Sequence, residues 1–475
     1  MWKPIYTSIL LLVITISSIG CATQEQIEYD IVLLNGNIID LQTGHISKQH
    51  IGITNGRIGI LKSSKANIPL VGKVEIDATD KYVLPGFWDN HVHFRGGDTL
   101  IEANKNFLKL FMANGITTVR DAGGDLTPSV MDWKKNISNG RLIGPTIFSS
   151  GPKIDGKNAT WAGSLEVEND GDIQKALDSL EQIPVDFVKL YDSQISGENY
   201  LRTIQEAEKR GLITSGHMPF TVTLDETVDA GIDAIEHLYY IMKGCSSNEV
   251  SVTNKIKTGE IGFWNAMPLL MQSYNDSTAG NTFASLKNNN VYVVPTLHIG
   301  KTLSYLDVED HANDMYLKYM SNGIIKTYEG RINRVKKSSP KAIADRKELD
   351  AFFGELAKSL NDVGVGLLSG SDSGAFNSYT YPGISLHKEL EEMVANGISP
   401  LEALRTSAYN GSKFLKKDDD YGTLEVDKIA DIILLDNNPL EDITNTKKIH
   451  YLIKNNTAYS TKQLEELLES TIKTD

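Results

Sequence analysis

Strand-like and helix-like segments alternate between residues 83 and 410, and this alternation constrains the fold of the chain more than any other feature. Helical stretches with apolar residues three and four apart occur, for example, at residues 172–180, 199–210 and 349–360. Eight apolar segments are predicted to be strands, at residues 83–94, 116–121, 146–150, 186–191, 212–217, 234–237, 291–297 and 365–369. Such alternation is typical of βαβ units with a parallel sheet. Eight units predict an α/β fold, a TIM-like (β/α)8 barrel whose active site lies at the C-terminal strand ends.

The two chain ends have the pattern of a β-structure. Residues 29–82 contain short strand-like runs, and the pairs Asn35-Gly36 and Asn55-Gly56 favour tight hairpins. Residues 430–435 and 451–453 are strand-like as well. We therefore expect residues 29–82 and 411–475 to form one small β-sandwich domain, with the barrel at residues 83–410 between them. Two long spacings, at residues 239–290 and 298–347, predict insertions that form a lid or a wall, with helices in the second.

The first residues are typical of a secretory signal. Lys3 precedes an apolar run at residues 5–16, which is too short for a transmembrane helix of about 20 residues. The small residues before Cys21 resemble a bacterial lipoprotein signal, although Ser18 stands where such signals usually have Leu. We expect residues 1–20 to be a signal peptide, residues 21–28 a linker, and Cys21 a lipid anchor to a membrane of the cell envelope, facing the periplasm or the surface. The alternative is a plain secreted protein cleaved nearby.

Composition limits the classes of partner. The formal net charge of -14 argues against nucleic acid, because phosphate binding depends on clustered Lys and Arg. A hydrophobic content of 40% in 475 residues allows a large core, and a small-molecule substrate is the expected partner. Cys21 and Cys245 are the two cysteines of the sequence, so lipidation of the first would preclude an intrachain disulfide. The oligomeric state is left open.

Potential metal ligands stand at the ends of the predicted strands. His91 and His93 close the first strand and point the same way, since side chains alternate between faces along a strand. Taken singly, each candidate has a simpler explanation: a lysine that extends to solvent, histidines satisfied in the core, or an aspartate that caps a helix. Together, on one rim, they predict a metal site, and the further members are Lys189, His217, His237 and Asp372.

Several motifs resemble the amidohydrolase superfamily, over nearly the whole mature chain. They are the segments 84–93, 115–121, 235–237 and 370–372. Segments 422–426 and 430–432 are most similar to the imidazolonepropionase-like and Xaa-Pro dipeptidase-like branch. The resemblance implies that His91, His93 and Asp372 hold one ion, that His217 and His237 hold a second, and that a carboxylated Lys189 bridges both.

The chemistry of these residue types agrees with the resemblance. Neutral imidazoles suit zinc and similar ions. A lysine can become a ligand only after it loses its proton and reacts with carbon dioxide, which burial and nearby cations favour. Two divalent ions, expected to be zinc, would share a hydroxide that attacks the substrate carbonyl. Asp372 is placed to take the proton of that hydroxide and pass it to the leaving nitrogen.

Three further features bear on the substrate. Tyr239 or Tyr240 could polarise the carbonyl in the transition state, or pack under the lid. His298 could reach the pocket. The loop at residues 151–161 lacks the histidine that dipeptidase-like relatives often have there, which argues against Xaa-Pro dipeptidase activity.

Arg120 and Asp121 have the pattern of a structural ion pair near the barrel rim.

The sequence thus predicts a binuclear metal-dependent amidohydrolase that cleaves an amide or cyclic amide C–N bond, with a peptide bond as one case. One alternative is a catalytically silent binding lipoprotein that keeps the fold, but such a protein has no need for a lysine among histidines. Another is a mononuclear deaminase, which would not need Lys189.

Overall fold

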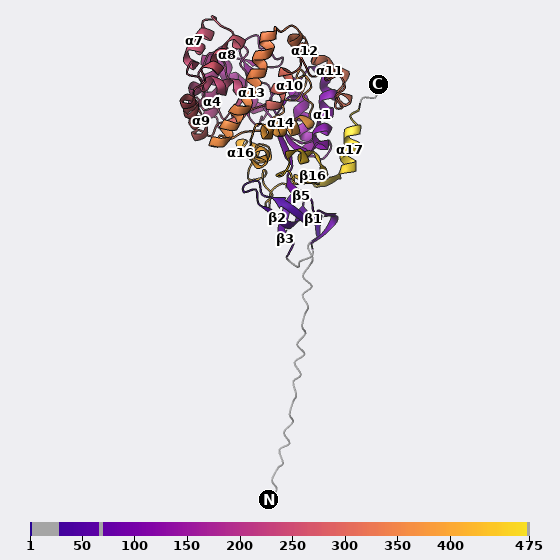
Figure 1. Ribbon diagram of the computed structural model, residues 1–475. Helices are drawn as coiled ribbons and strands as arrows, with labels where there is room; N and C mark the ends of the chain where they lie inside the picture. Colours follow the sequence, from indigo (N-terminus) through magenta and orange to yellow (C-terminus); the bar gives the residue numbers. More distant parts are fainter. Residues whose placement is uncertain (2–27, 66–69, 473–475) are drawn as a thin grey trace.

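A computed structural model describes residue 1 and residues 28–65 and 70–472. A mixed sheet lies at one end of the molecule, and a larger body, rich in helices, lies at the other (Figure 1). The predicted signal peptide, linker and Cys21 lie outside the described residues, apart from Met1 and Glu28. Within the described part of the chain, no helix combines the length and the hydropathy needed to cross a membrane.

The mixed sheet joins the two ends of the chain. It has the strand order β17-β16-β15-β5-β1-β2-β3, with β4 also paired to β1. The strands are β1 (Glu28–Ile39), β2 (Ile46–Thr54), β3 (Arg57–Ser63), β4 (Val71–Asp77), β5 (Tyr82–Pro85), β15 (Ile432–Leu435), β16 (Ile449–Lys454) and β17 (Thr457–Ser460). The two ends therefore share one β-structure, as predicted. Its description as a sandwich and the predicted domain limits stay predictions.

The two Asn-Gly pairs have different outcomes. Asn55 and Gly56 form the predicted hairpin between β2 and β3. The hairpin predicted at Asn35-Gly36 is wrong, because β1 runs through both residues with a register irregularity against β2. Asn35 adopts a φ of 64°, and its backbone N–H donates to Nδ1 of His50 at 3.1 Å. The positive φ of Asn35 is therefore part of a bulge within β1 and not of a turn.

The larger body contains parallel strands in two groups. One group has the order β6-β7-β8 and the other the order β10-β9-β11-β12-β13-β14, and every pairing within them is parallel. Their bounds are β6 (Phe87–Val92), β7 (Ile116–Asp121), β8 (Thr146–Ser149), β9 (Ile154–Asp155), β10 (Leu165–Glu166), β11 (Val188–Leu190), β12 (Thr214–Gly216), β13 (Ala234–Glu236) and β14 (Tyr292–Val294). Seven of the eight predicted strands are thus present, mostly shorter than predicted.

The eighth predicted strand, at residues 365–369, is not a regular strand. Leu367 forms an isolated parallel bridge with Val293, and Ser373 forms one with Val92. The backbone N–H of Asn90 donates to the carbonyl of Ser369 at 2.9 Å. This segment therefore contacts both β14 and β6.

Helices connect the parallel strands and fill both insertions, in agreement with the helices expected after residue 298. Caps explain several helix starts: Asn169 and Ser196 accept hydrogen bonds from backbone N–H groups at the beginnings of α3 and α4. The helices are α1 (Ile101–Ala113), α2 (Thr127–Ser138), α3 (Asp170–Gln182), α4 (Gly197–Lys209), α5 (Leu224–Asp229), α6 (Leu238–Gly244), α7 (Glu249–Lys257), α8 (Phe263–Gln272), α9 (Asp276–Asn288), α10 (Leu297–Ser304), α11 (Asn322–Thr327), α12 (Glu329–Lys336), α13 (Pro340–Val363), α14 (Ile384–Ala395), α15 (Pro400–Arg405), α16 (Ala408–Phe414) and α17 (Thr461–Glu469).

Gly86 connects the mixed sheet to the first parallel strand. It lies between β5 and β6, and its backbone N–H donates to the carbonyl of Asp431 at 2.9 Å. A Cβ at this position would lie 2.3 Å from Cγ2 of Thr117, so a larger residue would push β6 away from β7. The close approach fixes the direction in which β6 enters the body.

Candidate metal centre

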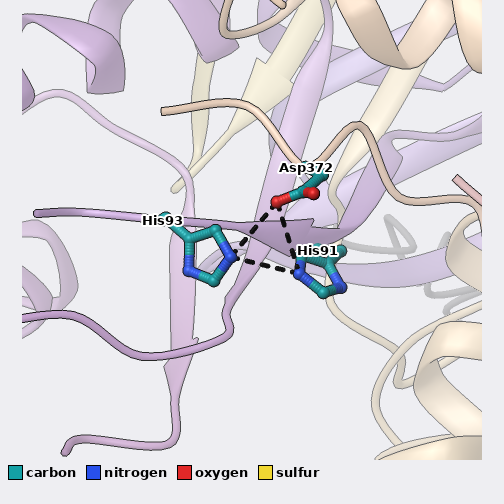
Figure 2. A group of neighbouring side chains, drawn as sticks. All are labelled: His91, His93 and Asp372. Carbon is teal, nitrogen blue, oxygen red and sulfur yellow. Dashed lines mark hydrogen bonds and ion pairs between the residues drawn. The ribbon is translucent and has the colours of Figure 1, made fainter. Parts of the chain in front are cut away.

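Three side chains converge at the end of β6. His91 lies in this strand, His93 follows it directly, and both point toward Asp372 (Figure 2). The Nε2 atoms of the two histidines are 3.2 Å apart, and Oδ1 of Asp372 lies 3.5 Å from Nε2 of His91 and 3.2 Å from Nε2 of His93. All three residues are buried, and their ligand atoms lie within 4.8 Å of one another. This group could hold a divalent metal ion.

The other ring nitrogen of each histidine is already engaged. Nδ1 of His91 contacts the carboxylate of Glu236, and Nδ1 of His93 lies 2.8 Å from the carbonyl oxygen of Gly123. Since both partners can only accept, each Nδ1 carries the proton and each Nε2 is left with a lone pair. Burial lowers the pKa of His91 and lowers that of His93 well below its usual value, so both rings are neutral. The donor set therefore fits a metal ion.

Backbone hydrogen bonds bring Asp372 to this place. Its N–H donates to the carbonyl of His91 at 2.7 Å, and its φ of 53° is in the left-handed region. Nδ2 of Asn377 donates to Oδ1 of Asp372 at 2.7 Å. Burial disfavours the charge of Asp372, whereas the hydrogen bond from Asn377 favours the ionised carboxylate. In its ionised form the carboxylate can bind a cation.

His217 and His237 face each other beside the first group. Their ring centroids are 4.7 Å apart, and the ring of His237 lies 5.2 Å from that of His91. Nδ1 of His217 lies 3.1 Å from Oδ1 of Asp192, and Nδ1 of His237 lies 2.7 Å from Oγ1 of Thr296. In both rings Nδ1 is engaged, which leaves Nε2 as the nitrogen that can coordinate. The structure therefore brings the four predicted histidines together.

Lys189 is completely buried in β11 and does not extend to solvent. Its Nζ lies 3.4 Å from Oε1 of Glu236 and has no hydrogen-bond partner among the residues that the structure describes. Burial lowers its pKa to about 8. A buried amine that loses its proton near neutral pH has the reactivity that carboxylation requires.

Glu236 organises this group and was not assigned a role by the sequence analysis. Its carboxylate contacts His91 and accepts a hydrogen bond from Nη2 of Arg120 at 2.9 Å. The ion pair predicted between Arg120 and Asp121 is wrong, because neighbouring side chains on β7 point to opposite faces. Asp121 instead accepts a hydrogen bond from Oγ of Ser149 at 2.7 Å. In the sequence, the position of Glu236 directly before His237 was the feature that could have indicated its role at the site.

A cavity of about 490 Å³ opens over the group. Its polar lining includes His93, His217, His237 and Asp372, and residues of α6, α8, α10 and α12 line it as well. Tyr239 lines the cavity, and its ring packs against Phe263, Trp264 and Phe353. The hydroxyl of Tyr240 donates to Oδ2 of Asp192 at 2.8 Å.

From the sequence, His298 could reach the pocket, and the structure places its backbone beside Glu389. It lies on α10, where its backbone N–H donates to Oε2 of Glu389 at 2.7 Å, and Thr296 and Ile299 of the same segment line the cavity. A second cavity, of about 530 Å³, adjoins the first and shares Tyr239, Trp264 and Phe353 with it. Met267 and Leu349 add apolar surface there.

The arginines of the cavity wall, Arg95, Arg331 and Arg334, were also missed by the sequence analysis. Arg95 follows His93 closely, and Arg331 lies on α12, in the second insertion. Nε of Arg331 donates to the carbonyl of Phe376 at 2.9 Å, and its Nη2 donates to Oδ1 of Asn377 at 2.6 Å. No strand end marks the position of Arg331, so the sequence offered no signal for it.

Curated relatives match parts of the sequence. The adenine deaminase of Staphylothermus marinus is 27% identical over 290 residues, which cover 57% of this chain and 46% of that protein. The dihydroorotase of Sulfurihydrogenibium sp. is 41% identical over 91 residues, which cover 19% of this chain and 21% of that protein. The chain thus spans less than half the length of these relatives.

Solved structures match over more of the chain. A bottromycin amidohydrolase aligns with a TM-score of 0.73 and 18% identity, over 93% of this chain and 90% of that one. A Xaa-Pro dipeptidase aligns with a TM-score of 0.65 and 19% identity, over 90% of this chain and 99% of that one. These likenesses concern the fold. The family model described as the amidohydrolase family matches residues 82–458, from β5 to β17, and the chain therefore belongs to the amidohydrolase family.

Proposed function

We propose that this protein is a metal-dependent hydrolase that cleaves the C–N bond of a small amide or cyclic amide. The observation that supports the proposal most is Lys189, a fully buried amine beside four histidines and an aspartate, with Oε1 of Glu236 3.4 Å from its Nζ. A binding protein with the same fold gains nothing from a buried lysine at this place, because burial of an amine among imidazole rings is costly.

In this proposal His91, His93 and Asp372 would hold one divalent ion, His217 and His237 would hold a second, and a carboxylated Lys189 would serve as a further ligand. Zinc suits the imidazole-rich set. When bound, two such ions lower the pKa of water and polarise a carbonyl group. Asp372 accepts the proton of the attacking water and delivers it to the leaving nitrogen.

The two tyrosines have different parts in this proposal. The hydroxyl of Tyr240 already donates to Asp192, which in turn contacts Nδ1 of His217. Tyr240 is therefore a positioning residue for His217. Tyr239 lines the cavity and is the better candidate to donate to the substrate carbonyl.

A second candidate function is deamination of an amino-substituted ring, which the similarity to an adenine deaminase over 290 residues favours. Both reactions break a C–N bond with water, and they differ in the leaving group. Release of ammonia from adenine, measured beside the hydrolysis of amides, distinguishes the two.

Three further proposals concern architecture and location. We propose that the parallel strands close into a (β/α)8 barrel through residues 366–373, supported by the bonds from this segment to both β14 and β6. The limits predicted for the domains belong to the same proposal. Export through residues 1–20 and anchoring through a lipid at Cys21 are also proposals, supported by the sequence pattern alone. Fractionation of cells that carry Cys21→Ala tests the anchor.

Lys189→Ala is the test of the proposed function. Parent and variant are loaded with zinc, the metal content of each is measured, and N-acyl amino acids, dipeptides and cyclic amides are screened as substrates. We expect about two ions per chain in the parent, one or none in the variant, and loss of turnover. Propionate is expected to restore part of the activity by supplying a carboxylate. Parental turnover with two ions in Lys189→Ala would contradict the proposal.

A further inference from the structure

The loop that carries Asp372 has a strained backbone. It spans residues 372–381, between α13 and α14, and three of its non-glycine residues have a positive φ. These are Asp372 at 53°, Phe376 at 71° and Tyr379 at 62°. Side chains disfavour this left-handed region, and such residues persist where the surrounding structure holds them. The shape of the loop therefore depends on contacts from other elements.

The second insertion supplies these contacts through α11, α12 and the residue between them. Oγ1 of Thr327 accepts a hydrogen bond from the backbone N–H of Phe376 at 2.8 Å, and Nε of Arg331 donates to the carbonyl of Phe376 at 2.9 Å. Oγ of Ser378 donates to the carbonyl of Tyr328 at 2.9 Å. The insertion thus holds the loop of Asp372, in addition to lining the cavity.

One of these contacts continues to the side chain of Asp372. Nη2 of Arg331 donates to Oδ1 of Asn377 at 2.6 Å, and Nδ2 of Asn377 donates to Oδ1 of Asp372 at 2.7 Å. Nδ2 also donates to the backbone carbonyl of Asp372. A guanidinium can only donate, so it holds the amide oxygen of Asn377 and leaves the NH2 group facing Asp372. Because Asn377 is only 1% exposed, solvent has little access to these contacts.

The hydrogen bond from Asn377 fixes the rotation of the Asp372 carboxylate. Oδ1, which accepts this bond, is also the oxygen that lies 3.5 Å from Nε2 of His91 and 3.2 Å from Nε2 of His93 (Figure 2). Oδ2 has no hydrogen bond among the residues that the structure describes. Oδ1 is therefore held where it can bind a cation, and Oδ2 is left free to accept a proton.

We propose that Arg331 is a positioning residue for Asp372 and acts through Asn377. Its guanidinium sets the orientation of the amide, and the amide in turn directs Oδ1 of Asp372 toward the two imidazoles. Without Arg331, the amide of Asn377 can turn its oxygen toward the carboxylate, and two acceptors then face each other. This role rests on the proposed function, in which Asp372 is both a metal ligand and the group that accepts the proton.

Two simpler roles of Arg331 predict different results. If Arg331 only contacts the substrate in the cavity, its removal leaves zinc affinity unchanged. If it only holds the loop through the carbonyl of Phe376, its removal lowers zinc affinity by a factor that does not depend on Asn377. The proposed role requires that the effects of the two residues are coupled.

Zinc affinity in a double-mutant cycle tests the role without a need for turnover. Competition with a chromogenic chelator gives the zinc affinity of the parent, Arg331→Met, Asn377→Ala and the double variant. Loss of a group that orients a metal ligand typically costs about 10-fold to 100-fold in affinity, so we expect this loss in Asn377→Ala and about 10-fold in Arg331→Met. In the Asn377→Ala background, Arg331→Met should change zinc affinity by less than about twofold.

Arg334→Met is the matched control. Arg334 lies three residues later on α12 and lines the same cavity, but its guanidinium has no hydrogen bond or ion pair within the described part of the chain. This variant should keep parental zinc affinity. Arg331→Lys keeps a donor for Oδ1 of Asn377 and should recover part of the lost affinity. Arg331→Leu replaces Arg331→Met in the cycle if that variant does not fold.

Parental zinc affinity in Arg331→Met, or an equal loss in Arg334→Met, would overturn the positioning role. Additive losses in the double variant would overturn it as well, because Arg331 would then act independently of Asn377. The proposed function fails on a different result, namely the absence of hydrolysis of any amide by zinc-loaded parent protein. Coupled losses of zinc affinity together with absent hydrolysis would retain the positioning role and reject the reaction.

Discussion

Glu236→Gln is expected to weaken metal binding by changing the tautomer of His91. The carboxylate of Glu236 can only accept, so it keeps the ring proton on Nδ1 and leaves Nε2 free. Its other oxygen accepts hydrogen bonds from Arg120 and Ser215. In the variant these two donors hold the amide oxygen, and the amide NH2 faces His91. The proton then moves to Nε2, which points toward His93 and Asp372.

The expected magnitude follows from these contacts. Loss of the carboxylate that orients a ligating histidine typically costs about 10-fold to 100-fold in metal affinity. Glu236 also balances the buried charge of Arg120, and removal of one member of a buried ion pair costs about 3–5 kcal/mol of unfolding free energy. Arg120 still finds an amide oxygen in the variant, so we expect a loss near the lower end of this range, about 3 kcal/mol.

Asp431→Asn is the matched control. Asp431 pairs with Lys454 at 2.6 Å in the mixed sheet, where both side chains are nearly inaccessible. This control should lower the unfolding free energy by a similar amount and leave zinc affinity unchanged. Urea unfolding of chelator-treated protein gives the stability, and competition with a chromogenic chelator gives the zinc affinity. Parental zinc affinity in Glu236→Gln, or an equal loss in Asp431→Asn, would refute the tautomer argument.

Three further predictions follow from other contacts. Burial raises the pKa of Glu389 to about 8, so the folded state binds a proton more tightly than the unfolded state. The free energy of unfolding should therefore fall as pH rises from about 4.5 to about 8. Glu389→Gln should flatten this pH dependence, measured by urea unfolding at several pH values. Tyr239→Phe should lower kcat at unchanged zinc content, whereas Tyr240→Phe should lower zinc affinity through Asp192; equal zinc affinity in both variants would contradict the division. Trp264, which is 53% exposed over both cavities, should bind bulky apolar groups, and Trp264→Ala should raise KM about 10-fold for an aromatic amide and little for an acetamide.

The sequence was informative where one local pattern determined the outcome. Residues 116–121 form β7 with the predicted bounds, since a fully buried strand between two helices leaves few other conformations. The histidines at positions 91 and 93 share a face because of strand geometry alone. The gathering of Lys189, His217 and His237 followed from the rule that parallel strands end on one rim, and their roles stay proposals.

The sequence was uninformative where position depends on long-range packing. Asn35 and Gly36 have the residues of a hairpin, yet contacts with β5 and with His50 keep them inside β1. Arg331 comes from an insertion whose path over the cavity no local pattern encodes. Lys153 looked like an ordinary loop lysine, because its burial depends on Trp161, a residue in the same loop that folds over it.

The pairing of strand β5 depends on parts of the chain that are synthesised at different times. Its antiparallel partner β15 belongs to the last part of the chain, and Leu84 pairs with Ile433. The hydrogen bond from Gly86 to Asp431 lies immediately before the strand that bears His91. While the ribosome is still translating, β5 can pair with β1 but lacks its antiparallel partner β15. A product truncated before residue 431 would therefore lose the hydrogen bond that fixes Gly86 at the start of β6, the strand that bears His91.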